Sequence, residues 1–321
     1  MMNLRHRFQI GFGSVLLITT LLLPRSAGGH AGERHAVEAI NAQIKDHGET
    51  AELLMRRARS FHILGAIQEE RADLDRVIQW YPDFRPARIA MAQFHLDRQD
   101  FKKALDLATA LLEKWPDASD VGTVHVVCGD AYILAGRPSA AVTSYERALE
   151  YSQDEVEWHL KRSEALAKLA RHRDRAVALQ TARVKLPSIV LELEWVDALI
   201  ECNDAESARM AMTIIEPKLA RSRLRSSWLM RRARVYLVLD QHASARIDLA
   251  EALRELDNRI AVQHPDPSLL VDRAYVFALQ GENLRAVQDL DAAKQHGALG
   301  RRADRVQRAI SDISAADKSV D

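Results

Sequence analysis

The sequence is poor in the residues that end or bend secondary structure, with only 9 prolines and 13 glycines in 321 residues. Strands joined by tight turns use both residues heavily, so this scarcity favours helices. Cysteine is rarer still, and the two thiols, Cys128 and Cys202, lie far apart in the sequence. Such a pair excludes a disulfide-stapled framework. We expect two small apolar side chains, and a single bridge between them stays open as an alternative.

The sequence has no surplus of either charge, since 45 Lys and Arg balance 45 Asp and Glu. A general nucleic-acid binder carries a basic surplus, so we expect no nucleic-acid partner. A Gly-rich phosphate loop and the HExxH, CxxC and GxSxG motifs are also lacking. The 12 histidines are scattered without metal-ligand spacing. We therefore expect a protein that is not an enzyme and has no catalytic residue, metal site or cofactor.

One long, largely apolar run is present, at residues 8–23, and Arg5 and Arg7 precede it. The run is short for a membrane span, which needs about 20 apolar residues, and the small residues after Pro24 suit a signal peptidase. We expect residues 1–31 to be a signal peptide and the mature chain to be periplasmic or secreted. The alternative is that residues 8–23 are retained as an anchor, which would hold the protein on a membrane.

Small and aromatic residues recur along the rest of the chain at constant offsets. Ala58 and Ala92 begin two such sets 34 residues apart. The same offsets join three further sets, namely Gly129, Tyr132, Ala141, Tyr145 and Ala148; Ala233, Tyr236, Ala245, Leu249 and Ala252; and Ala274, Phe277, Ala286, Leu290 and Ala293. Recurrence at one period indicates an array of structural repeats.

This pattern resembles the tetratricopeptide repeat, a 34-residue unit of two antiparallel helices. The resemblance implies an all-α fold, a right-handed α-solenoid of stacked antiparallel helix pairs, because one pair cannot bury its apolar face alone. Seven units fit residues 51–298, beginning near residues 51, 85, 122, 157, 189, 226 and 267. The fourth unit fits least well, because Glu164 takes its early small position.

Both ends of the array are predicted to be caps. Residues 32–50 have the pattern of an amphipathic half-repeat, with Ile40 and Ile44 on its inner face. Residues 299–313 are expected to form a closing helix whose residues Arg301, Arg302, Asp304 and Arg305 face solvent, since solenoid ends need polar caps. Residues 314–321 are expected to be a disordered tail.

The resemblance also implies a concave groove, lined by the first helix of each unit, that receives a peptide or a partner helix. The positions that helical geometry turns toward this groove include Arg56, Arg59, His62, Gln93, Asp130, Trp158, Lys161, Asp197, Met230, Arg231, Arg234 and Tyr275. We therefore expect a non-catalytic protein–protein interaction scaffold outside the cytoplasm. The alternatives are a membrane-anchored assembly factor and an accessory subunit of an envelope enzyme.

One stretch within the repeats is strongly basic. Residues 218–234 contain no acid and carry Lys218, Arg221, Arg223, Arg225, Arg231, Arg232 and Arg234. Acids on both sides favour neutralisation by neighbouring helices, in surface pairs that contribute about 0–1 kcal/mol each. The alternative is that this band docks an anionic partner, such as an acidic protein segment, a phosphate-bearing glycan or a lipid headgroup.

Overall fold

The computed structural model describes residues 30–262, 266–296 and 300–318, which fold into sixteen helices without a strand among them. The predicted signal peptide lies almost entirely outside these residues. None of the helices in the described ranges has both the length and the apolar character that crossing a membrane requires. The all-α prediction is confirmed.

Seven helix pairs follow one another along the chain, and we number them as units one to seven. The first helices of units one to seven are α2 (Ala51–Leu64), α4 (Arg85–Asp97), α6 (Val121–Leu134), α8 (Val156–Lys168), α10 (Ile189–Glu201), α12 (Arg225–Val238) and α14 (Pro267–Leu279). The second helices are α3 (Ile67–Trp80), α5 (Phe101–Lys114), α7 (Pro138–Tyr151), α9 (His172–Lys185), α11 (Ala205–Leu219), α13 (His242–Val262) and α15 (Asn283–Gln295). Each first helix begins within one residue of an expected unit start.

The turn inside every unit has the same backbone conformation at the same position. Residues with positive φ occur where each first helix ends, namely Gly65, Gln99, Gly136, Ala170, Asn203, Asp240 and Gly281. A left-handed residue at this point ends a helix and lets the chain reverse, and glycine adopts it without strain. Only three units have glycine there, so the pairing of helices imposes the turn on the other four.

Small residues lie where the two helices of a unit cross. In unit three, a Cβ built on Gly129 would lie 2.3 Å from the ring of Tyr145, and Ala141 is fully buried. The ring therefore fills the space that the missing side chain leaves, as the repeat pattern predicts. Unit four differs from the expected register by one residue, because the small buried residue there is Ser163 and not Glu164. Arg175 takes the place that alanine holds in unit three, and it donates to Ser163 Oγ at 2.8 Å.

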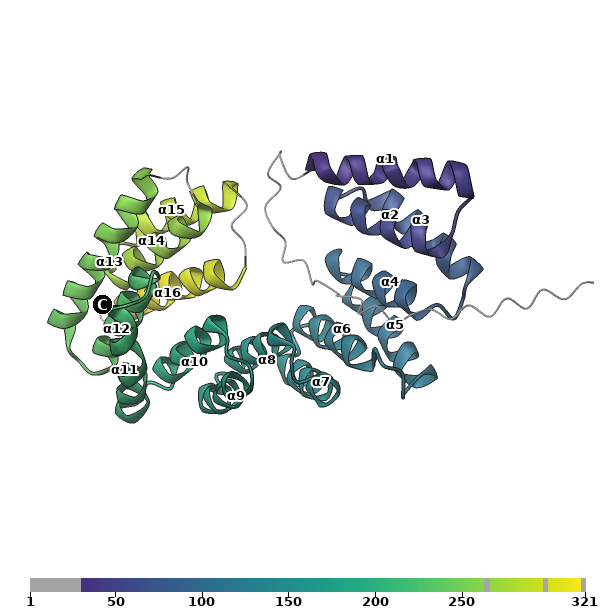
Figure 1. Cartoon of the computed structure of the whole chain (residues 1–321). Coiled ribbons are helices and arrows are strands. Elements are labelled where there is room, and N and C mark those ends of the chain that lie inside the picture. Colours follow the sequence, from purple (N-terminus) through teal and green to yellow (C-terminus); the bar gives the residue numbers. More distant parts are fainter. Residues whose placement is uncertain (1–29, 263–265, 297–299, 319–321) are drawn as a thin grey trace, which may run out of the picture.

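The stacked units form an open curve, with helices α1 (His30–His47) and α16 (Arg301–Lys318) at its two ends (Figure 1). Helix α1 packs on α2 of unit one, with Ile40 buried and Ile44 partly buried. Helix α16 turns into the inside of the curve and packs mainly on α14. It also continues to Lys318, so most of the predicted disordered tail is helical, while residues 319–321 lie outside the described ranges.

Candidate functional site: a buried charge cluster under α16

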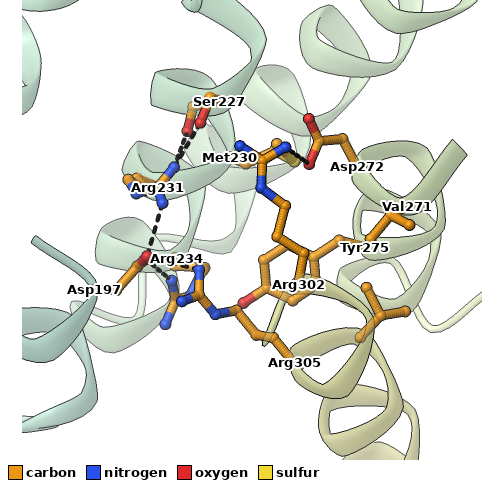
Figure 2. Close-up of a pocket in the computed structure, with 11 residues that line it drawn as sticks. Asp197, Ser227, Met230, Arg231, Arg234, Val271, Asp272, Tyr275, Arg302 and Arg305 are labelled. Atoms are coloured by element: carbon orange, nitrogen blue, oxygen red, sulfur yellow. Dashed lines mark hydrogen bonds and ion pairs between the residues drawn. The ribbon is translucent and has the colours of Figure 1, made fainter. Parts of the chain in front are cut away.

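A group of interacting charged side chains lies on the concave face of units five to seven. Asp197 of α10 is fully buried and accepts hydrogen bonds from three arginines. Arg231 and Arg234, both from α12, reach it from the next unit, Arg231 at 2.7 Å. Arg305 of α16 reaches it from 108 positions away in the sequence, also at 2.7 Å. One carboxylate thus joins three helices, as Figure 2 shows for the residues around it.

A second carboxylate, Glu194, lies one turn before Asp197 on α10 and shares Arg305 with it. It accepts from Arg305 at 3.0 Å and from Arg175 of unit four at 2.6 Å. Arg175 is buried and bridges onward to Glu201 at the end of α10. Removing an ion pair completely from water costs free energy. Each acid here offsets that cost because it is hydrogen-bonded to more than one guanidinium group. We call Asp197, Glu194, Arg231, Arg234 and Arg305 the charge cluster.

Burial alone would raise the pKa of the Asp197 carboxyl, because removing a charge from water disfavours it. The guanidinium groups of Arg231, Arg305 and Arg234 nevertheless hold that pKa well below its usual range. Asp272 of α14 is not surrounded by three guanidinium groups in this way. Burial raises the pKa of Asp272, and Arg302 of α16 opposes that shift from 3.6 Å. The Asp197 carboxyl group is therefore ionised at neutral pH.

The contact between α16 and the concave face leaves only a small cavity, of about 40 Å³. Asp197, Ser227, Met230, Arg231, Arg234, Val271, Asp272, Tyr275, Arg302, Arg305 and Val306 line it (Figure 2). About 10–15 Å³ of such space suffices for one water molecule, so this cavity has room for only a few waters. Pockets for small molecules usually measure about 300–1,000 Å³, so this cavity is small by comparison.

The structure brings together the predicted groove residues of units five to seven. Asp197, Met230, Arg231, Arg234 and Tyr275 all line this cavity. The prediction for α16 was wrong for Arg305, which faces the cluster and not solvent, whereas Arg302 and Asp304 are exposed as predicted. Sequence reasoning also missed Arg175, Glu194 and Glu201 as one connected set. Their spacing in the sequence could have predicted only that the two acids, Glu194 and Glu201, lie on one face of α10.

The predicted groove residues of units one to four lie apart from the cluster. Arg56 and Arg59 are exposed on α2, and Gln93 is half-buried on α4. His62 is held between two acids, at 3.2 Å from Glu70 and 3.6 Å from Asp97.

Between units three and four, Asp130 accepts hydrogen bonds from Tyr145 at 2.7 Å and from Lys161 at 2.8 Å. Trp158, also predicted to line the groove, packs between these two units. Its ring packs over Gly122, where a Cβ would lie 2.9 Å from it, and the side chain is half-buried. This tryptophan joins units three and four instead of offering a free surface.

The basic band of residues 218–234 is largely neutralised by neighbouring helices. Arg225 pairs with Glu251, and Arg232 forms a bidentate pair with Asp248 at 2.7 Å. Lys218 pairs with Glu192, while Arg231 and Arg234 belong to the charge cluster. Arg221 and Arg223 are the exposed members. The neutralised interpretation of the band therefore fits the structure, and the anionic-partner alternative does not gain a continuous basic surface.

Neither a disulfide nor a cluster of metal-binding side chains is found among the described residues. Cys128 and Cys202 are both free, and burial raises the pKa of the Cys128 thiol to about 11. A thiol with so high a pKa is a poor nucleophile. The described residues also contain no group of three or more histidine, cysteine or acidic side chains arranged to hold a metal ion.

Stacked antiparallel helix pairs around a concave face define a helical-repeat solenoid. No protein-family model matches the chain. A tetratricopeptide repeat protein from Parabacteroides merdae superposes with a TM-score of 0.56 at 15% identity, over 81% of this chain and 98% of that one. Yeast Tom70 gives a TM-score of 0.53 at 16% identity, over 91% of this chain and 60% of that one.

A likeness in sequence exists to Superkiller complex protein 3 of Mus musculus, at 26% identity over 233 residues. The match takes in 70% of this chain but spans only 14% of the mouse protein. The structural likenesses show that the chain has the fold of a tetratricopeptide-repeat solenoid, as the recurring alanine and aromatic positions predicted.

Proposed function

We propose that the protein is a non-catalytic scaffold that binds an extended or helical segment of a partner protein along the concave face of units one to four. The observation that supports this proposal is that a helix covers the concave face in one half of the curve and not in the other. Helix α16 packs on α14 and α15 and reaches α10, whereas α2, α4, α6 and α8 have no comparable helix across them in the described part of the chain.

The side chains on this open stretch are mixed in charge. Helix α2 carries the exposed Arg56 and Arg59 one turn apart, and Glu52 lies one turn before Arg56. Gln93 on α4 adds an amide, and Leu134 at the end of α6 is an exposed apolar side chain. A surface with several separate polar groups and few apolar ones suits a protein segment recognised at many points.

The test is charge reversal on the concave face in the full chain. We expect the double variant Arg56→Glu, Arg59→Glu to lose partners that the wild-type chain retains on an affinity matrix, as quantified by mass spectrometry. The matched control is the double variant Arg209→Glu, Arg246→Glu, which reverses two exposed charges on the second helices α11 and α13. Equal loss of partners from both variants would show that the concave face has no special role.

We also propose that the protein acts outside the cytoplasm. The support is the pattern of residues 1–31, in which Arg5 and Arg7 precede a largely apolar run and small residues follow it. Mass spectrometry of the mature amino terminus tests this, and a start near residues 28–31 is the expected result. An intact residue 1 in the membrane fraction would instead favour the anchored alternative.

A further inference from the structure

We propose that the concave surface of units five to seven is a docking site for an arginine-bearing amphipathic helix of a partner protein, and that α16 is its built-in occupant. A partner helix would then bind by displacing α16. This inference rests on the proposed scaffold function, but it concerns a different surface from units one to four and a different probe tests it.

Helix α16 does not pack as the first helix of an eighth unit would. At junctions inside the solenoid, a first helix packs chiefly on the second helix before it, as α12 does on α11 and less on α10. Helix α16 does the reverse, since it packs more on α14 than on α15. Figure 1 accordingly shows it on the inside of the curve, where a ligand of the groove would lie. Its place is that of a bound helix.

The contacts of α16 define what the site recognises. Arg305 divides its guanidinium between Asp197 at 2.7 Å and Glu194 at 3.0 Å. On the same face Ala303, Val306 and Ile310 are buried against the apolar side chains of unit seven. The planar fork of a guanidinium can meet two carboxylates together, which an ammonium group cannot do equally well. A competing helix would therefore carry an arginine with apolar residues two before, one after and five after it.

The site stays formed when α16 leaves. Asp197 keeps Arg231 and Arg234, both of which belong to the solenoid itself. Glu194 keeps Arg175. Neither acid is left buried without a cation, so exchanging one arginine-bearing helix for another creates no unpaired charge. Both carboxylates therefore stay in position to accept hydrogen bonds from the arginine of an incoming helix.

The experiment uses the full chain and a fluorescent peptide of residues 300–318. In the wild-type chain the tethered α16 competes with the peptide at an effective concentration on the order of millimolar. The variant Val306→Asp places a charge at a side chain that is 1% exposed, and it should release α16. We expect this variant to bind the peptide at least about tenfold more tightly than the wild-type chain does. The control Gln307→Asp makes a similar change at an exposed residue of α16 and should behave as wild type.

Peptide variants test the recognition itself. Arg305→Gln in the peptide should weaken its binding to the Val306→Asp chain by about tenfold or more, because a hydrogen-bonded charge pair is lost. Arg308→Gln removes an arginine from an exposed position and should leave binding unchanged. Equal binding by both peptides, or no binding of the unaltered peptide to the Val306→Asp chain, would overturn the proposal.

Hydrogen exchange on the wild-type chain keeps the proposal testable if the Val306→Asp chain does not fold. We expect excess peptide to accelerate amide exchange in the tethered α16 and to leave α14 protected. A rate in α16 that the peptide does not change would identify α16 as a fixed cap. A dimer that exchanges α16 between copies, seen by light scattering, would assign the site to a second copy of this chain. Either result would refute docking of a partner helix.

Discussion

Replacing Asp197 by asparagine should destabilise units five and six strongly. The change is nearly isosteric, so it removes the negative charge and leaves the packing in place. Arg305 would keep Glu194, and Arg234 would keep Glu201 at 3.7 Å. Arg231 would keep only Ser227, although it is only 8% exposed. Losing the anion from a buried ion cluster costs about 3–5 kcal/mol, and we expect a loss of this size in the free energy of unfolding.

The assay has to resolve regions of the chain, because repeat arrays unfold in parts and not always in a single step. Hydrogen exchange with mass spectrometry should show faster exchange in α10 and α12 of the Asp197→Asn chain and unchanged exchange in α4 and α6. The matched control is Asp257→Asn, which alters a half-exposed partner of Arg273 and should cost no more than about 1 kcal/mol. Equal protection of α10 in the two variants would refute the reasoning.

The same substitution gives a test by pH. Because the folded-state pKa of Asp197 is lowered, its stabilising effect is fully present above the unfolded-state pKa of about 3.9. The effect is lost as the pH falls through the folded-state pKa. The stability difference between the wild-type and Asp197→Asn chains should therefore be constant near neutral pH and shrink below about pH 4. A difference that grows on acidification would contradict the ion-pair account.

Three further predictions concern single residues. Ala170→Gly should stabilise the chain by about 1 kcal/mol in urea unfolding, since Ala170 has a φ of 53° that glycine adopts freely; no gain would mean that the turn is not strained. Gly129→Ala should destabilise it, by up to about 3 kcal/mol, whereas Gly32→Ala, with nothing within 4 Å, should not; equal effects would contradict the close helix crossing. The pKa of His62 is raised, chiefly by its hydrogen bond to Glu70, so its stabilising effect is complete below about pH 6.5 and is lost as the pH rises through the folded-state pKa. Proton NMR should show this raised midpoint, and a midpoint that does not fall in Glu70→Gln would exclude Glu70 as its cause.

The repeat could be predicted because its determinants are local and recur. Gly129, Ala141 and Tyr145 interact within a single helix pair, and the same kinds of residue meet again in every well-matched unit. The register failed only in unit four, where Ser163 and Arg175 replace two small apolar residues. A polar pair at a helix crossing does not fit the apolar pattern, so the repeat spacing indicated Glu164, one position away.

The sites could be predicted only in part. Helical geometry placed Asp197, Arg231 and Arg234 on the concave face correctly, because the face of a helix follows from its period of 3.6 residues. It could not show that the two arginines converge on one carboxylate in the preceding unit. That contact depends on how far adjacent units rotate against each other. The packing of the Trp158 ring on Gly122 of the unit before it depends on the same rotation.

The sequence by itself determined the helix pairs and their order, because these follow from contacts between residues close in the chain. Only the tertiary structure decided that α16 lies across units five to seven. Arg305 and Asp197 are 108 positions apart, and no repeat spacing connects them. A contact between distant segments depends on the curvature that all the intervening units build together, and this curvature brings an end helix back over the charge cluster.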